Sequence, residues 1–305
     1  MTNIKNFNAL SILLAERGVK KRIVVVNPDD ESTLWALDKA RRSGFCETII
    51  IDDDDRPTAA QKAVQLVREG KADVLMKGFI NTDVLLHAIL NKEYGILEPG
   101  SVMTHITAAS LPVYDKLIFF TDAAVIPYPT QEQRVQQVRY MVNLCHCFGI
   151  DVPRVSLIHS SEKVDARHFP YTEGYVEIKK MAQNGDFGHC IVDGPLDLKT
   201  SCDHHAMQVK GIKSPINGHA DALIFPNIEA GNLFYKTITL FCNATTAAIL
   251  QGTKVPVVLP SRGDSPETKF NSIALACILE EPPPRTLRIL INKRGSAAPI
   301  LAWCV

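Results

Sequence analysis

Two short polar segments in the second half of this 305-residue chain could do chemistry. Residues 227–236, Asn-Ile-Glu-Ala-Gly-Asn-Leu-Phe-Tyr-Lys, follow the apolar run 222–225. Residues 261–265, Ser-Arg-Gly-Asp-Ser, follow the apolar run 255–260. Open α/β sheets bind ligands at the carboxyl ends of their strands, and Ser, Arg, Asn and Lys grouped there suit a phosphate or an oxyanion. The two segments therefore predict an anion site.

Ser261 and Arg262 are the leading catalytic candidates. Arginine presents a planar fork that matches two phosphate oxygens. The Ser261 hydroxyl, with neighbouring backbone amides, could face an oxyanion. The alternative is a surface loop in which Arg262 only forms an ion pair.

The segment 227–236 offers a second set of candidates, including Asn227 and Glu229. Gly231 allows a tight turn. Asn232, at a predicted helix start, can aim its amide and nearby N–H groups at an anion, and Lys236 lies one turn further on the same face. The alternative is a strand–turn–helix in which Asn and Gly serve only their turn conformations.

Lys77 and Gly78 form a third candidate, at the end of the predicted strand 72–76. Lys77 would supply positive charge to a phosphate, and Thr82 would cap the next helix and face the site. Asp193, in a strand-end turn, is a further candidate for facing the site. The alternative for Lys77 is a solvated side chain beside a flexible glycine.

Blocks of sequence between Lys20 and Leu279 resemble the phosphate acetyltransferase and phosphate butyryltransferase family, and they occur in that family's order. They are residues 72–78 with 81–83, 119–124, 192–196, 211–216, 220–236 and 260–264. Lys77 and the Pro-Ile-Asn-Gly of 215–218 are more similar to the butyryl branch.

The resemblance implies an enzyme that moves a short acyl group between coenzyme A and inorganic phosphate to give an acyl phosphate. The acyl group would be butyryl, with acetyl and branched-chain groups as alternatives. The coenzyme A thioester would be a substrate, with no permanently bound cofactor. Catalysis would fall to Ser261 and Arg262. The residues implied to bind phosphate or substrate are Lys77, Gly78, Thr82, Asn227, Glu229, Gly231, Asn232 and Lys236.

The resemblance also implies a fold similar to isocitrate and isopropylmalate dehydrogenases. Such a fold has two three-layer α/β domains with mostly parallel sheets and an active site in the cleft between them. A homodimer or higher homo-oligomer is implied as well.

The chain departs from the family pattern at two candidate positions and in its tail. The acetyl branch has an Asp, proposed as a base, where this chain has Thr268, with Glu267 beside it. An Arg implicated in coenzyme A binding is replaced by His87. The resemblance ends near Leu279, before the proline-rich tail. These departures favour one alternative, a non-catalytic protein that binds acyl-coenzyme A and phosphate.

Strand and helix patterns alternate in the first part of the chain. The runs 22–26 and 48–51 indicate strands, and apolar residues at helical spacing over 31–42 indicate a helix between them. This alternation predicts a mostly parallel sheet with right-handed crossovers.

The predicted domain boundary is Pro127-Tyr-Pro129, which precedes a long amphipathic helix over 131–148. Domain 1 would then comprise 1–127 plus 253–305. Domain 2, at 128–252, would be inserted between these two parts.

Composition bounds the remaining possibilities. Lys plus Arg and Asp plus Glu both number 33, so a basic excess typical of nucleic-acid proteins is absent. Neither a signal peptide nor an 18-residue apolar stretch is evident, and eight cysteines lack a disulfide framework. These features predict a cytoplasmic protein without membrane or nucleic-acid partners.

Neither a metal nor a nicotinamide cofactor is predicted. Cys145, His146 and Cys147 are adjacent on a helix and point in different directions, which disfavours a shared ion. The acidic run 52–55 is contiguous, not a spaced ligand set. A glycine-rich dinucleotide fingerprint is missing after the first strand, where Val26-Asn-Pro-Asp29 stands. A metal- and NAD-dependent dehydrogenase is therefore the weakest alternative.

Overall fold

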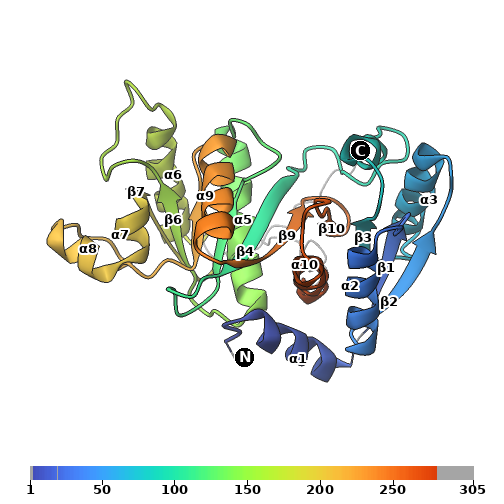
Figure 1. Ribbon diagram of the computed structural model, residues 1–305. Helices are drawn as coiled ribbons and strands as arrows, with labels where there is room; N and C mark the ends of the chain where they lie inside the picture. The colour runs from blue at the N-terminus through green and yellow to red at the C-terminus, as the bar shows by residue number, and fades with distance from the viewer. Residues whose placement is uncertain (1–2, 19, 280–305) are drawn as a thin grey trace, which may run out of the picture.

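The computed structural model describes residues 3–18 and 20–279. They form an α/β structure on one ten-stranded sheet, in the order β2-β1-β3-β10-β9-β4-β5-β8-β6-β7 (Figure 1). The strands are β1 (Lys21–Val26), β2 (Cys46–Ile51), β3 (Val74–Lys77), β4 (Thr104–Ser110), β5 (Ile118–Thr121), β6 (Arg154–Ile158), β7 (Ile191–Leu196), β8 (Ala222–Ile224), β9 (Thr245–Gln251) and β10 (Val257–Val258). The helices are α1 (Phe7–Arg17), α2 (Glu31–Arg42), α3 (Arg56–Arg68), α4 (Thr82–Ile89), α5 (Gln131–Cys147), α6 (Tyr171–Gln183), α7 (Leu198–Cys202), α8 (His204–Val209), α9 (Ile228–Phe241) and α10 (Pro266–Ile278).

The sheet is parallel at its two ends and antiparallel in its middle. β2, β1, β3 and β10 are parallel neighbours, as are β5, β8, β6 and β7. β9 runs antiparallel to β10 and β4, and β4 runs antiparallel to β5. The predicted α/β class and mostly parallel pairing are therefore confirmed.

One continuous sheet replaces the expected separate sheets of two domains. β4 and β9 were not among the predicted strands, and they pair along their full length from Thr104 opposite Gln251 to Ser110 opposite Thr245. Their pairing joins the two parallel ends. The division into 1–127 plus 253–305 and 128–252 stays a prediction.

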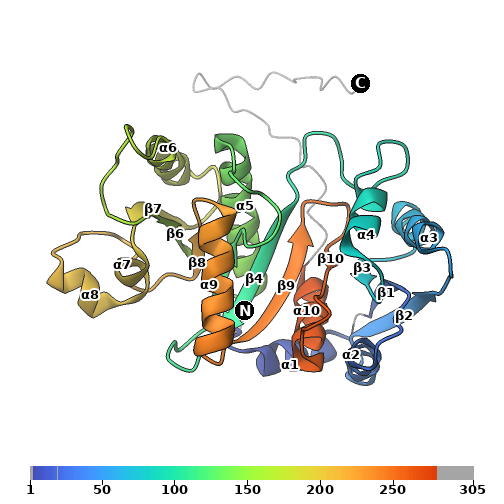
Figure 2. The same ribbon diagram turned by 45° about the horizontal axis from the view of Figure 1, so that its top comes forward.

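The two faces of the sheet are covered differently (Figure 2). One face carries a continuous apolar core that includes residues of α1, α2, α10, α5 and α6. The other face carries two separate cores, one under α3 and α4 and one under α9. Between these two cores the β4–β9 pair presents a strip of polar and small side chains: His105, Thr107, Thr246 and Ala248.

Side-chain caps begin the helices that leave the sheet near this strip. Asp30 accepts a hydrogen bond from Thr33 N at 2.9 Å and starts α2. Asn227 accepts one from Ala230 N at 3.0 Å and starts α9. Ser265 accepts one from Thr268 N at 3.1 Å and starts α10. Each cap satisfies an amide of the first helical turn that would otherwise lack a partner.

Membrane spans, disulfides and metal ligands can each be described for part of the chain. Within residues 3–18 and 20–279 the helices are all too short or too polar to cross a membrane. The seven cysteines of that part form no disulfide with one another. The same part of the chain has no group of three His, Cys, Asp or Glu side chains placed to hold a metal ion.

Candidate active site

A pocket of about 440 Å³ lies at the carboxyl ends of β3 and β10, beside the start of α4. It brings together four residues that the sequence predicted for the site, Lys77, Thr82, Ser261 and Arg262. The remaining lining residues are Ile80, Asn81, Asp83, Leu259 and Pro260. Segments about 180 residues apart in the sequence thus form one site.

Lys77 is a buried cation at the base of this pocket, with 4 % of its surface exposed. Its Nζ donates to two backbone carbonyls, those of Gly78 and Ile80, both at 3.3 Å. Burial, together with the positive charges of Arg262 and Lys269, lowers the pKa of Lys77 below its ordinary value. The Lys77 ammonium is hydrogen-bonded to neutral carbonyls, with Asp30 and Asp264 acting on it electrostatically. A buried ammonium of this kind favours an incoming anion, because the anion would stabilise the charge.

Gly78 is required where β3 ends against β1. A Cβ at this position would collide with the carbonyl oxygens of Val26 and Asn27. The Gly78 amide instead donates to Val26 O at 2.9 Å. Glycine therefore serves the close packing that holds Lys77 in place.

Arg262 is exposed and oriented by two neighbours from the other side of the pocket. Its Nη2 donates to Asn81 Oδ1 at 2.8 Å, and its guanidinium carbon lies 5.2 Å from the centre of the Phe79 ring. Asn81 occupies the N-cap position of α4 without making a side-chain cap bond, so the expected cap by Thr82 is not formed. Thr82 is the first helical residue and lines the pocket.

Asp264 fixes the loop that carries Ser261. The Ser261 amide donates to Asp264 Oδ2 at 2.8 Å, and the Asp264 amide donates to Ser261 O at 3.2 Å. The same carboxylate acts electrostatically on Lys77, on His105 of β4 and on Tyr235 of α9. Asp264 therefore shapes the loop through its own hydrogen bonds and adds negative charge to the surroundings of Lys77, His105 and Tyr235.

Lys269 adds a second buried cation behind the pocket. Its Nζ lies 2.7 Å from Asp30 Oδ1, 2.5 Å from Ser32 Oγ and 3.0 Å from Thr33 Oγ1. Burial opposes ionisation of Asp30, but hydrogen bonds from Lys269, Ser32 and Thr33 outweigh burial and hold the pKa of that carboxyl well below its usual range. This network ties α10 to the start of α2.

The segment 227–236 has partners that position α9. Gly231 packs against the turn after β5, where a Cβ would collide with the carbonyl oxygen of Asp122. Asn232 Nδ2 donates to Ala123 O at 2.9 Å, and Glu229 accepts from Tyr128 Oη at 3.0 Å. Asn227 caps the helix and Lys236 is exposed. A direct role of these residues in binding stays a prediction.

The three further candidates lie outside the lining of this pocket. Asp193 on β7 is paired with Lys179 Nζ at 2.5 Å and accepts from Gly194 N. His87 is exposed in the last turn of α4, and Glu267 is exposed in the first turn of α10. Thr268 contributes its amide and hydroxyl to the Ser265 cap.

Asn81 lines the pocket and Asp264 holds its Ser261 loop, whereas Lys269 and His105 lie outside the lining; none of the four was among the predicted site residues. Asn81 and Asp264 lie inside the sequence blocks that resemble the family, so these polar side chains could have been predicted as site residues. His105 gave no such signal because its strand was not predicted.

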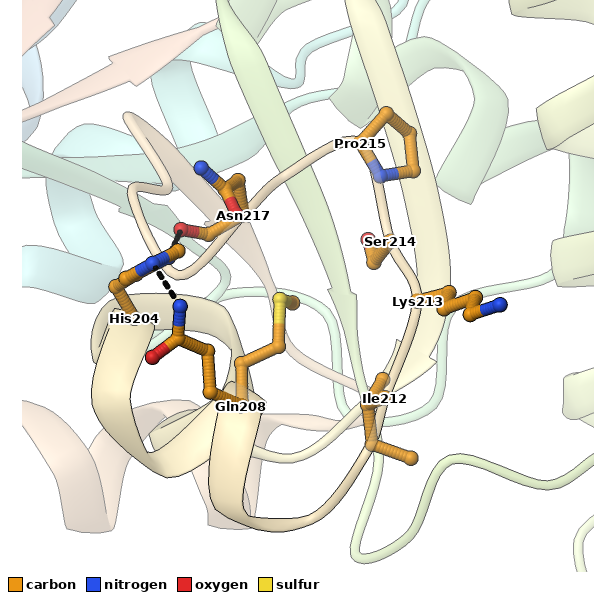
Figure 3. Close-up of a pocket in the computed structure, with 8 residues that line it drawn as sticks. His204, Gln208, Ile212, Lys213, Ser214, Pro215 and Asn217 are labelled. Carbon is orange, nitrogen blue, oxygen red and sulfur yellow. Dashed lines mark hydrogen bonds between the residues drawn. The ribbon is translucent and has the colours of Figure 1, made fainter.

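A second pocket, of about 490 Å³, lies between α8 and the loop that follows it (Figure 3). There the His204 ring lies 3.1 Å from Asn217 O through Nδ1 and 2.8 Å from Gln208 Nε2 through Nε2. These contacts suit a neutral ring that donates from Nδ1 and accepts at Nε2. Its lining includes none of the predicted site residues.

Comparison with known proteins identifies the family. The family model described as "Phosphate acetyl/butaryl transferase" matches residues 56–277. The chain is 36 % identical over 299 residues to a phosphate butyryltransferase of Clostridium acetobutylicum, covering 90 % of this chain and 98 % of that protein. It is 34 % identical over 284 residues to a phosphate acetyltransferase of Thermotoga maritima, covering 86 % and 96 %.

Solved structures agree with these sequence comparisons. A branched-chain phosphotransacylase from Enterococcus faecalis V583 superimposes with a TM-score of 0.76 at 30 % identity, covering 85 % of this chain and 98 % of that one. A putative 4-hydroxythreonine-4-phosphate dehydrogenase from Salmonella typhimurium has a TM-score of 0.51 at 10 % identity, covering 85 % and 99 %. The second match shows a shared fold alone.

Proposed function

Because the chain belongs to the phosphate acetyl/butyryl transferase family, we propose that it transfers a short acyl group between coenzyme A and inorganic phosphate. The product in one direction is an acyl phosphate. The observation that carries this proposal is the meeting of Lys77, Ser261 and Arg262 in one pocket.

Phosphate binds between Lys77 and Arg262. Lys77 supplies a buried charge without a carboxylate bonded to it, and Arg262 supplies a planar fork at the mouth. Asn81 and Phe79 hold the guanidinium, so part of the entropy of orienting it is already lost before phosphate arrives.

The Ser261 hydroxyl donates a hydrogen bond to the oxyanion of the intermediate or to the departing sulfur. Its side chain is exposed in the loop that Asp264 holds, close to the guanidinium that follows it in sequence. A phosphate oxygen attacks the thioester carbonyl, and the tetrahedral intermediate then expels the coenzyme A sulfur. One donor to the developing oxyanion contributes about 3–4 kcal/mol, and holding the two anionic reactants together contributes roughly 7–11 kcal/mol.

The active site lies in the cleft between two α/β domains. Its first wall is the Lys77 and Ser261 region, and its second wall is α9 with Asn227, Glu229, Gly231, Asn232 and Lys236. The action of Asp264 on both Lys77 and Tyr235 supports this arrangement. The strip that separates the two apolar cores would then be the floor of the cleft.

Butyryl is the proposed acyl group, with acetyl and branched-chain groups as alternatives. Ile80, Leu259 and Pro260 give the pocket an apolar side that suits a short chain. The chain-length preference is measured by comparing kcat/KM over a series of acyl-coenzyme A thioesters.

The proposed function is tested by mixing the protein with butyryl-coenzyme A and phosphate. Release of free thiol together with formation of an acyl phosphate, trapped as its hydroxamate, is the expected result. Binding of both substrates without thiol release would reject transferase activity in favour of a non-catalytic binding protein.

We also expect a homodimer or higher homo-oligomer. Leu233, Leu240 and Phe241 are exposed on one side of α9, at 69 %, 71 % and 77 %. An apolar helix face of this kind is typical of a surface covered by another protein. Light scattering after size exclusion measures the mass, and a monomer at micromolar concentration would contradict the expectation.

A further inference from the structure

Lys77 is an amine inside the pocket that the proposed reaction fills with an activated acyl group. It lines that pocket together with Ser261 and Arg262, although only 4 % of the residue is exposed. The proposed product is an acyl phosphate, in which a bridging oxygen is all that separates the carbonyl carbon from the phosphorus. A lysine that holds the phosphate of this molecule is therefore also close to its carbonyl carbon.

The hydrogen bonds of the Lys77 nitrogen leave it free to lose a proton. Nζ donates to the carbonyl oxygens of Gly78 and Ile80 at 3.3 Å, which is long for an N–H···O bond. Within the described part of the chain, no carboxylate is bonded to this nitrogen. A bonded carboxylate would favour the protonated form, and only the neutral amine attacks a carbonyl.

The charges around Lys77 act in the same direction. Burial lowers the pKa of Lys77, and so do the positive charges of Arg262 and Lys269. Asp30 and Asp264 oppose this shift without reversing it. Lysines that are desolvated beside another cation are nucleophilic for this reason. At a given pH, the neutral amine is thus more abundant at Lys77 than at an ordinary lysine.

We propose that Lys77 is acylated by the bound acyl phosphate when coenzyme A is absent, and that the resulting amide closes the site to phosphate. This inference rests on the proposed function, because the same pocket must bind the acyl phosphate. The amide carries no charge, and its acyl chain occupies the pocket beside Ile80 and Leu259. Turnover therefore stops when acyl phosphate accumulates without its acceptor.

The atoms and charges balance without another reactant. The neutral amine of Lys77 attacks the carbonyl carbon of the acyl phosphate and forms a C–N bond. The C–O bond to phosphate then breaks, and its electron pair leaves with the phosphate. The nitrogen gives a proton to that phosphate, so the products are an amide and hydrogen phosphate. When coenzyme A is present, its sulfur takes the acyl group instead.

The test is to incubate the wild type with butyryl phosphate, without coenzyme A, and to follow each lysine by peptide mass spectrometry. The butyryl label at Lys77 should form at a rate that saturates with butyryl phosphate and that falls when inorganic phosphate is added. Turnover should decline in proportion to the label. Hydroxylamine should not restore it, because hydroxylamine cleaves acyl esters and thioesters but not amides. An unlabelled Lys77, or a label that grows linearly and ignores phosphate, overturns the proposal.

Two other lysines of the same chain are the controls. Lys269 is as buried as Lys77, but it is paired with Asp30 Oδ1 at 2.7 Å and lies outside the pocket lining, so it should stay unlabelled. Lys180 is exposed in the last turn of α6, so its label should grow linearly and should not respond to phosphate. Equal labelling of Lys77 and Lys180 in the folded protein would reject the proposal.

R262A and K77R give measurements that do not depend on the wild type alone. R262A keeps the amine but lacks the guanidinium that binds phosphate, so the half-saturating butyryl phosphate concentration for labelling should rise about 10²-fold or more. K77R keeps the charge in a group that is not deprotonated, so the turnover it retains should survive incubation with butyryl phosphate. Unchanged saturation in R262A, or inactivation of K77R equal to that of the wild type, counts against the proposal.

The outcomes separate this inference from the proposed function, provided that thermal unfolding shows each variant to be folded. A wild type that is labelled at Lys77 but never releases thiol from butyryl-coenzyme A would reject the transferase and support the acylation. An active wild type whose Lys77 stays unlabelled rejects only the acylation.

Discussion

Replacing Arg262 by alanine should separate activity from stability. Arg262 is exposed, and its described contacts are one hydrogen bond to Asn81 and stacking on Phe79. Surface substitutions of this kind change the free energy of unfolding by about 0.5 kcal/mol or less. R262A should therefore unfold at nearly the wild-type denaturant concentration.

The effect on turnover should be large. A bidentate guanidinium makes two hydrogen bonds to a charged phosphate, each worth about 1.5–3 kcal/mol. Their sum, about 3–6 kcal/mol, corresponds to a loss of about 10²- to 10⁴-fold in kcat/KM for phosphate. R262K keeps the charge but not the planar fork, so its loss should be intermediate.

The assay is initial-rate acyl-phosphate formation at varied phosphate concentration, with denaturant unfolding of each variant in parallel. Arg68→Ala is the matched control, because Arg68 is an exposed arginine that donates to Glu93 O outside the pocket. Near-normal turnover in R262A, or an equal loss in Arg68→Ala, would refute the assignment.

The pH dependence of kcat/KM in R262A tests whether Arg262 lowers the pKa of Lys77. Arg262 is one of the causes that lower the pKa of Lys77, after burial. If phosphate binding needs the Lys77 charge, kcat/KM should decline at alkaline pH below the ordinary lysine value of about 10.4. In R262A that decline should occur at higher pH, and no movement would show that the two cations act independently.

Three substitutions elsewhere test the supporting structure. Lys77→Met should abolish measurable turnover yet raise the free energy of unfolding at pH 7 by about 1–2 kcal/mol, since a buried charge is removed. The unfolded chain binds more protons than the native one between the lowered and ordinary pKa of this lysine, so wild-type stability should rise with pH there and the variant should lack that rise. Lys269→Met should cost about 3 kcal/mol in urea unfolding because it leaves Asp30 without its cation; this cost should shrink below about pH 4, where the unfolded carboxyl is protonated. Gly231→Ala should lower the free energy of unfolding by about 2–3 kcal/mol, because the new Cβ collides with Asp122 O. Without that collision alanine would stabilise the helix by about 1 kcal/mol, so unchanged or higher stability would contradict the packing.

Much of the first parallel group was readable from the sequence. The predicted runs 22–26, 31–42 and 48–51 correspond to β1, α2 and β2, because β-branched runs and helical apolar spacing are local signals. The long helix predicted over 131–148 is α5, whose Thr130–Gln133 capping box is also local.

The middle of the sheet was not readable in the same way. β4 and β9 are stabilised by pairing between residues about 140 positions apart, and their sequences, Thr-His-Ile-Thr-Ala-Ala-Ser and Thr-Thr-Ala-Ala-Ile-Leu-Gln, have no strong alternation. Strand preference in such segments depends on neighbours across the sheet and not on the backbone itself.

The sequence by itself determined the family and which groups were candidates for chemistry: Lys77, Ser261 and Arg262, each at or just beyond the end of a strand. The tertiary structure decided which groups meet. It placed Asn81 on Arg262, Asp264 on the Ser261 loop and His105 in the strip between two cores. The physical reason is that residue type and local spacing fix what a side chain can donate or accept, whereas its neighbours depend on the register of strands that are distant in sequence.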